Sequence, residues 1–342
     1  MSDNPKKKIN RNASPSAYGW AFQVGAGIKL MLDHVKEFEC LKMEGKYDDI
    51  EITLSGNKKI YAQAKSVTQM GDQSTANVNL KKSLEVLDAD SENEDSAQLI
   101  YITNILNPLS TSSKLSPFYD KYDKIYDYSV LPATDQQKII DLVGSDFPLE
   151  QFQIHVLRFF GKDEEKFDGI KEAIEKFLQE ALGETSHIHN LWPKWYTLFS
   201  LNCTDKPKEE MSFDKTKKEI LQPVIVLAID PPVEREEFQE VSDYDDYGEI
   251  KKQYLNLINN CAYDYEFSTP VLGAYHLGKG KADRGDRAKY KYKFVSDKWK
   301  EYEKYFSEIS NDDVREAVTK MTLLTIIVRS DKLESIRKAI NS

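Results

Sequence analysis

Apolar residues recur with two different periods along the N-terminal part of the chain. From Tyr18 to about Phe38 they come at nearly helical spacing, which predicts one long and mostly buried helix. The segments 39–44, 49–54 and 59–66 alternate instead between apolar and polar residues, which predicts three strands. Gly45 and the polar residues of 55–58 supply turns between them, so the three strands should form a meander.

A second helix and a fourth strand complete this α/β order. The pattern predicts the helix over 74–88 and the apolar strand over 98–104, with an acidic loop at 90–95 between them. Further along, helical spacing dominates, and a further strand is expected at 151–159. Helices are expected in this region over 134–144, 164–182 and 188–202.

An apolar run that ends at two prolines divides the chain. The run, 223–232, is expected to be a short buried strand or helix that stops where the prolines begin. We therefore predict a domain boundary at this point. The expected parts are a disordered basic arm over 1–16, a domain with a helical extension over 17–230, and a mainly helical C-terminal domain over 231–342.

The composition is that of a folded globular protein. Hydrophobic residues make up 40% and charged residues 30% of the 342 residues, which is enough chain for two domains. The apolar runs stay far short of the roughly 20 residues that cross a bilayer, and the basic N-terminus lacks the apolar core of a secretory signal. We therefore expect a cytoplasmic protein without a membrane partner. Cys40, Cys203 and Cys261 indicate neither a disulfide framework nor a structural zinc site.

The alternation on the third predicted strand brings candidate chemistry into view. Gln63 and Lys65 are two residues apart on 59–66, so they share one face of the strand. Pairing with the preceding strand through the turn at 55–58 brings an acid opposite them. We favour Asp49 as that acid, and the choice between Asp48 and Asp49 stays open.

These residue types suit the hydrolysis of a phosphodiester. A bound Mg²⁺, with Mn²⁺ as an alternative, activates water and neutralises phosphate charge when oxygen ligands leave coordination positions open. Asp49 would be the main metal ligand, and the carbonyl oxygen of Gln63 would be a weaker one. Lys65 would orient water or offset charge in the transition state. Glu44 and Gln23 would be outer members of the site.

Four segments follow one another in an order that is typical of a known family. The segments are 19-GWAFQ-23, 44-EGKYDDIEI-52, 61-YAQAKS-66 and 99-LIYITN-104. Their order resembles that of the PD-(D/E)xK nucleases, and most that of their Mrr-type branch, in which Q-x-K replaces (D/E)-x-K. More narrowly, it resembles the double-stranded DNA endonuclease effector domain of bacterial antiphage systems of the CBASS and Lamassu kinds.

The resemblance implies a fold, an activity and a biological setting. The fold would be a restriction-endonuclease-like mixed sheet flanked by helices, and the activity that of a Mg²⁺-dependent endonuclease on double-stranded DNA. Asp49 and Lys65 would be the core catalytic residues, with Gln63 at the second-ligand position and Gln23 where related enzymes often have a helix Glu. The C-terminal domain would sense, oligomerise or dock a partner, and a homo-oligomer or a defence complex with an SMC-like ATPase or a cyclase-linked signal would release the activity.

Other interpretations of the same residues stay open. A strand with Gln and Lys two apart is usually a solvated face, and an Asp-Asp pair before a strand is usually a turn. Gln23 and Gln63 leave few fixed carboxylates, which also fits a catalytically weak or inactive nucleic-acid-binding or scaffold subunit. RNA is an alternative substrate, because the chemistry is shared.

A second candidate feature is a basic segment in an acidic chain. The formal net charge of −10 excludes bulk attraction as a way to coat nucleic acid, so any contact depends on clustered cations. The segment 279–293 has seven Lys and Arg against two Asp, a local charge of +5, and is expected to be a loop. It is either ordinary charged surface or a nucleic-acid contact. The candidate binding residues are Lys279, Lys281, Arg284, Arg287 and Lys289.

Overall fold

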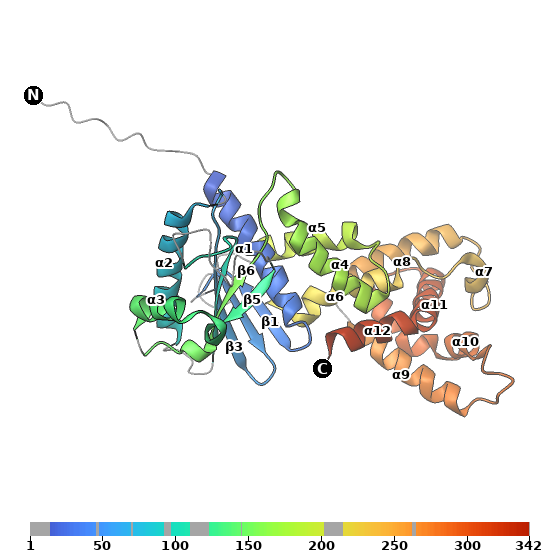
Figure 1. Cartoon of the computed structure of the whole chain (residues 1–342). Helices are drawn as coiled ribbons and strands as arrows, with labels where there is room; N and C mark the ends of the chain where they lie inside the picture. The colour runs from blue at the N-terminus through green and yellow to red at the C-terminus, as the bar shows by residue number, and fades with distance from the viewer. Residues whose placement is uncertain are drawn as a thin grey trace, which may run out of the picture. The chain divides into compact units, whose positions relative to one another are not determined.

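The chain is organised as two compact units. The computed structural model describes residues 14–45, 48–69, 71–91, 97–109, 123–144, 146–201, 215–261 and 265–341. Residues up to 174 together with 195–215 form the N-terminal unit, and residues 175–194 together with 216–342 form the C-terminal unit. The elements of each unit are labelled in Figure 1.

The N-terminal unit is built on a mixed seven-stranded sheet in the order β5-β6-β4-β3-β2-β1-β7. β1, β2 and β3 form an antiparallel meander, β4 joins β3 in parallel, β6 joins β4 in parallel, and β5 is antiparallel to β6. The expected α/β class with a mixed sheet is therefore confirmed. The strands are β1 (Phe38–Met43), β2 (Ile50–Leu54), β3 (Lys58–Lys65), β4 (Gln98–Thr103), β5 (Lys124–Asp127), β6 (Phe152–Val156) and β7 (Lys215–Thr216).

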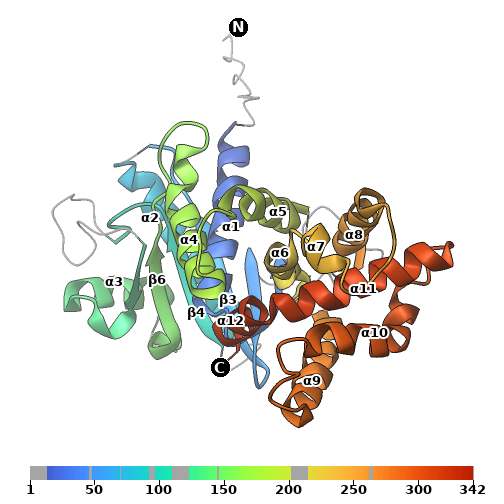
Figure 2. The same ribbon diagram turned by 90° about the vertical axis from the view of Figure 1, so that its right-hand side faces the viewer.

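Helices cover both faces of this sheet. α1 (Ser14–Asp33) lies on one face, and α2 (Gln73–Ser91) and α3 (Ala133–Val143) lie on the other, as Figures 1 and 2 show. Leu84 and Leu87 of α2 pack with Tyr101 of β4 in one apolar cluster. On the other face α1 packs tightly, because a Cβ atom added to Gly27 would lie 2.7 Å from the Sδ atom of Met43. The sheet is therefore covered by helices on both faces.

Some boundaries differ from those expected. The first helix begins at Ser14 and ends at Asp33, so 14–16 belong to the helix and not to a basic arm; residues 1–13 lie outside the described residues. The helix ends early because Phe38 already begins β1 and is fully buried in the sheet. The edge strand β5 was not predicted, since its sequence KIYD has a single buried residue, Tyr126.

Apart from Thr216, the regular secondary structure of the described residues in the C-terminal unit is helical. α4 (Asp168–Leu182) and α5 (Ile188–Leu201) each contribute to both units. None of the described helices has the combination of length and apolar composition that a bilayer span requires. The remaining helices are α6 (Lys217–Ile229), α7 (Arg235–Phe238), α8 (Tyr247–Cys261), α9 (Tyr265–Lys281), α10 (Tyr290–Tyr302), α11 (Asp312–Val328) and α12 (Ser330–Ile340).

The unit boundary lies earlier than the predicted one at 230. Residues 223–229 of the apolar run form the second half of α6, a helix that begins with a capping box in which Thr216 and Glu219 exchange side-chain and main-chain hydrogen bonds. α6 packs against α9 and α12. An apolar helix belongs to the core in which it is buried, so the division falls at 215 and within α4 and α5.

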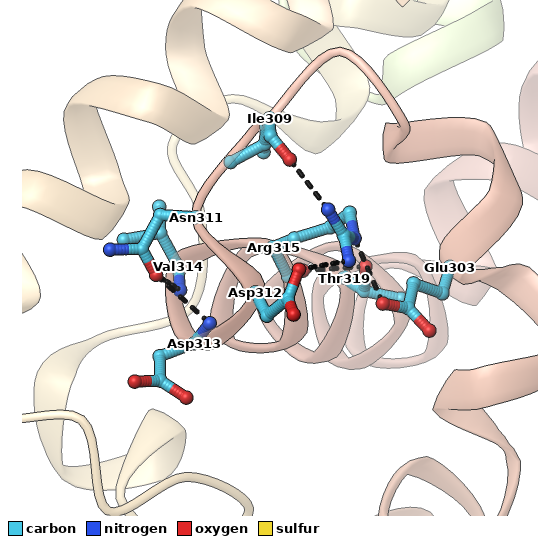
Figure 3. Close-up of polar contacts among 8 residues, drawn as sticks. All are labelled: Glu303, Ile309, Asn311, Asp312, Asp313, Val314, Arg315 and Thr319. Atoms are coloured by element: carbon cyan, nitrogen blue, oxygen red, sulfur yellow. Dashed lines mark hydrogen bonds and ion pairs between the residues drawn. The ribbon is translucent and has the colours of Figure 1, made fainter.

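Contacts of the Arg315 guanidinium fix the turn before α11. Arg315 contacts the Glu303 carboxylate through Nε at 2.8 Å, the Ile309 carbonyl through Nη1 at 2.7 Å and the Asp312 carboxylate through Nη2 at 2.5 Å. Asn311 caps the same helix by accepting hydrogen bonds from the main-chain N–H groups of Asp313 and Val314. Figure 3 shows these contacts converging on the first turn of α11. We call this set the Arg315 joint.

Candidate active site

The candidate site lies at the end of the sheet where β3 extends beyond the end of its pairing with β2. The β2–β3 ladder ends at the pair Ile50 and Ala62, whereas β3 continues to Lys65 alongside β4. The main-chain N–H of Ala64 accordingly has a side-chain acceptor, the Oδ2 atom of Asp49, at 2.9 Å. A carboxylate thus takes the place of the missing strand, and this fixes Asp49 at the end of the sheet.

Asp49 and Lys65 form an ion pair at this end. Lys65 Nζ lies 3.0 Å from Oδ1 and 2.8 Å from Oδ2 of Asp49. The Asp49 side chain is 9% exposed and that of Lys65 is 31% exposed, so the carboxylate is nearly buried while the ammonium stays reachable from solvent. The contact expected from strand alternation is present, and Asp49 rather than Asp48 makes it.

Glu44 and Gln23 adjoin this pair. Glu44, in the turn after β1, has a positive φ of 49° and donates its main-chain N–H to the Asp49 carbonyl at 2.8 Å. Its side chain is hydrogen-bonded to Gln23 of α1. Desolvation raises the pKa of the Glu44 carboxyl, and the negative charge of Asp49 adds to that rise. Gln23, Glu44, Asp49 and Lys65 therefore share one electrostatic environment.

Gln63 has a different partner from the one expected. Its Nε2 atom donates to Oδ1 of Asp48 at 2.6 Å, and Gln63 and Asp48 are only 6% and 4% exposed. The sequence suggested that Gln63 would act beside Asp49. The structure instead divides the adjacent acids, since Asp49 faces Lys65 and Asp48 faces Gln63.

Asp90 is a member of the site that the sequence pattern did not reveal. It lies in the last turn of α2, not in the predicted acidic loop, and is 3% exposed. Asp48 and Asp90 each have a buried Oδ2 atom that no donor among the described residues satisfies. Burial, followed by the contact with Asp90, raises the pKa of Asp48 to about 9, so Asp48 holds a proton at neutral pH that both carboxyl groups can share.

A periodic signal could have placed Asp90 correctly. Leu80, Leu84 and Leu87 mark the buried side of α2, and Asp90 follows Leu87 by the same three-residue step. The composition of the next residues, rich in Asp and Glu, instead favoured a loop. The spacing of the buried leucines, continued to position 90, would have predicted that the Asp90 carboxyl group is buried.

Asn104 secures the chain segment that follows Lys65. It is fully buried just after β4, accepts from Val67 N at 2.8 Å, and donates to Val67 O at 2.8 Å and to Phe159 O at 3.1 Å. This clamp restricts the loop two residues beyond Lys65. The signal in the sequence was an asparagine directly after an apolar strand. A strand end that lies in water does not need a buried amide there.

The side chains of the site offer oxygen atoms, which are the type of ligand that a hard divalent cation prefers. Asp49 and Glu44 offer carboxylates, and Gln23 and Gln63 offer amide oxygens; Mg²⁺ is commonly held by one or two carboxylates with water completing its shell. Among the residues that the structure describes, no group of three or more His, Cys, Asp or Glu side chains is arranged to hold a metal ion. A cation here would therefore depend on Asp49 and Glu44, with water or phosphate supplying other ligands.

The predicted loop over 279–293 is confirmed for residues 282–289 only, because 279–281 belong to α9 and 290–293 belong to α10. α9 continues to Lys281 and α10 begins at Tyr290, so the eight residues 282–289 connect the two helices. Lys279 lies over the Tyr275 ring at 5.4 Å, and the other four candidate cations are exposed. All five belong to the C-terminal unit, whereas the carboxylates and Lys65 belong to the N-terminal unit. The exposed cations are Lys281, Arg284, Arg287 and Lys289.

Comparisons with protein-family models, curated proteins and solved structures gave no match to this chain. The chemistry of the site is therefore the basis on which a function can be inferred.

Proposed function

We propose that the protein is a Mg²⁺-dependent DNA endonuclease. The observation that carries the proposal is the pairing of Asp49 with Lys65 at 2.8 Å, at the end of the sheet, with a second carboxylate, Glu44, beside them. A phosphodiesterase needs acid oxygens for a cation and a positive group for the phosphate, and this cluster contains both.

Each side chain has a chemical role in this proposal. Asp49 and Glu44 would hold the ion, which when bound would supply Lewis-acid activation of water and neutralisation of phosphate charge. The exposed side of Lys65 would face the phosphate, where its ammonium offsets negative charge that grows in the transition state. Asp49 keeps Lys65 in place before substrate arrives, because the ion pair and the Ala64 N–H fix both groups.

The biological setting rests on the resemblance of the sequence to antiphage effector nucleases. In that setting the protein is a cytoplasmic effector whose activity is released by other subunits or by its own oligomerisation. The occupied state of Asp49 supports restraint, because Lys65 and Ala64 already use both of its oxygens. The exposed cations around Arg284 and Arg287 are proposed to contact the DNA backbone.

Cleavage of supercoiled plasmid in Mg²⁺ tests the proposal. Wild-type protein should nick or linearise the plasmid, and Asp49→Ala and Lys65→Ala should remove that activity. Lys59→Ala is the matched control, because Lys59 lies on the same strand but its ammonium contacts Thr53 at 2.6 Å. The catalytic proposal fails if wild type, Asp49→Ala and Lys65→Ala behave alike, with and without the native partner proteins.

A non-catalytic nucleic-acid-binding or scaffold subunit is the second candidate. It is favoured by the lack of a three-ligand acid group among the described residues and by glutamine at positions 23 and 63. Isothermal titration with Mn²⁺ separates the two functions. A nuclease should bind the ion and lose that binding in Asp49→Ala, whereas a scaffold should show no binding that depends on Asp49.

A further inference from the structure

The exposed side of α10 carries a row of lysines that the candidate active site does not use. We propose that this row, Lys289, Lys293 and Lys300, is a docking surface for the phosphate backbone of double-stranded DNA and that it does not read the base sequence. The choice of DNA as the ligand rests on the proposed function, which the row deepens by naming a helix face that holds the substrate. We call these three residues the α10 lysine row.

Helical geometry places the three lysines on one face. Successive residues of an α-helix are turned by about 100°, so positions 289, 293 and 300 lie within roughly 40° of one another and span about 16 Å along the axis. Lys289 is the N-cap residue and has helical φ and ψ, and all three lysines are exposed. The buried residues of the helix lie on the opposite side, so the row faces away from the core of its unit. These buried residues are Phe294, Val295 and Tyr302.

The ammonium groups of the row are available to an anionic ligand. Lys300 Nζ lies 5.5 Å from the centroid of the Trp299 ring, so a neutral ring orients it without cancelling its charge. Lys293 Nζ lies 3.2 Å from Oδ2 of Asp297, but the two side chains are 70% and 57% exposed. An ion pair this exposed contributes little free energy, so a phosphate can replace the carboxylate at small cost.

The chain on either side of the row adds to its positive charge. α9 and α10 pack against each other, as Figures 1 and 2 show, and residues 282–289 connect them. From 279 to 304 the chain has ten Lys and Arg against five Asp and Glu, a local charge of +5 (ten minus five) in a protein whose formal net charge is −10. Cations clustered in this way attract a polyanion in spite of an acidic overall charge.

The side chains of α10 favour phosphate over base edges, and DNA over a lipid surface. Lysine is a compact point charge, whereas the planar groups of Arg, Asn and Gln make bidentate contacts that distinguish bases, and α10 contains none of these three residue types. A basic helix that binds a membrane also presents large apolar side chains to the lipid. Among the described residues, no large hydrophobic side chain of α10 is exposed. We therefore expect contact with DNA that does not depend on its sequence.

Fluorescence anisotropy of labelled DNA duplexes at several salt concentrations tests the row, in EDTA so that no cleavage occurs. Lys293→Gln combined with Lys300→Gln should make the slope of log K against log salt shallower by about 1.8, at about 0.9 for each phosphate that is no longer neutralised. The change should be the same for two duplexes of equal length and unrelated sequence. Lys293→Arg combined with Lys300→Arg should keep the wild-type slope, because both charges are retained.

A variant with the same loss of charge outside the row is the control. Lys298 lies on the opposite side of α10 from the row and is paired with Glu301, and Lys252 is exposed on α8. Lys298→Gln combined with Lys252→Gln should therefore change the slope much less. Circular dichroism melts check that each variant folds. If the double variant of the row does not fold, the single variants Lys293→Gln and Lys300→Gln decide the question, each with an expected change of about 0.9.

The outcomes distinguish the α10 lysine row from the proposed catalytic function. Absence of DNA binding by the wild type, an unchanged slope in the folded Gln variant, an equal change in the control variant, or a change that differs between the two duplexes would overturn the role of the row. Weaker binding of the Gln variant to vesicles of phosphatidylserine and phosphatidylcholine, with an unchanged slope on DNA, would also overturn it and assign the row to a lipid surface. Plasmid cleavage by the wild type would leave the nuclease proposal intact in each of these cases. A shallower slope in the Gln variant, without cleavage by the wild type and its partners, would keep the row and overturn the nuclease proposal.

Discussion

The two charged clusters of this molecule are built on opposite principles. In the Arg315 joint of the C-terminal unit, one guanidinium meets the carboxylates of Glu303 and Asp312 and a main-chain carbonyl. At the end of the N-terminal sheet, Asp49 pairs with Lys65 and adjoins Glu44, while Asp48 contacts Asp90. In the first cluster each of these acceptors has the guanidinium as its partner, whereas in the second Asp48 and Asp90 each keep a buried Oδ2 atom that no donor among the described residues satisfies.

This difference indicates different functions. A planar guanidinium with several fixed acceptors is suited to holding two chain segments together, here the turn before α11 and the helix itself. Carboxyl groups crowded in a partly buried place raise one another's pKa values, and such arrangements are concentrated at sites of binding and catalysis. The Arg315 joint therefore fits a role in stability, and the acid cluster fits the chemistry that we propose for it.

Removing the cation from each cluster should give the largest contrast. Lys65→Met should lower plasmid cleavage by roughly 10²–10³-fold, as expected when one electrostatic interaction is removed from a transition state, with little change in Tm because Lys65 is partly exposed. Arg315→Met should keep cleavage and lower Tm, because two carboxylates and a carbonyl lose their common partner. Identical cleavage and melting profiles for the two variants would remove the distinction between the clusters.

The clamp at Asn104 should make the next largest difference. Asn104→Ala removes three buried hydrogen bonds and should lower the free energy of unfolding by about 2–4 kcal/mol, at roughly 1 kcal/mol for each hydrogen bond. Urea denaturation measures the loss. Asn190→Ala, at an exposed position of α5, is the control and should change stability little. Equal stability of the two variants would show that the clamp contributes nothing.

The pH dependence of stability should report the buried acid pair. The pKa of Asp48 is raised from 3.8 to about 9, so between these values the unfolded chain has lost a proton that the folded protein keeps. The contribution of Asp48 to stability should thus be greatest below about pH 4 and should decline as pH rises toward 9, by at most about 1.4 kcal/mol per pH unit. Urea denaturation at pH 5, 7 and 9 should show a flatter profile in Asp48→Asn. A decline of equal slope in both proteins would assign the effect to other groups.

The smallest effect concerns the exposed cations of the C-terminal unit. Changing them to glutamine should weaken DNA binding and reduce the slope of log K against log salt by about 0.9 for each phosphate that the variant no longer neutralises. Fluorescence anisotropy at several salt concentrations gives the slope. Lys251→Gln with Lys252→Gln on α8 is the control for a general change in charge. An unchanged slope would leave this region as ordinary surface. The residues to change are Lys279, Lys281, Arg284, Arg287 and Lys289.

The sequence by itself determined the first half of the sheet. The expected strands agree with β1, β2, β3 and β4 within one residue at each end, and the following helix is α2 with longer ends. Strand and helix periods are local properties of the chain, because each reflects which side chains must be buried by a regular backbone. The same alternation put Gln63 and Lys65 on one face of the strand, whereas the contact of Lys65 with Asp49 forms beyond the end of the β2–β3 ladder.

Tertiary structure decided which residues meet from distant parts of the chain. Asp90 reaches Asp48 because α2 crosses the sheet, and α6 belongs to the C-terminal unit because α9 and α12 bury its apolar side. The glycine-rich end of α9 is helical although its composition favours a loop. Local patterns fix the faces of each element, and only the packing of those faces determines which acids, amides and cations share a site.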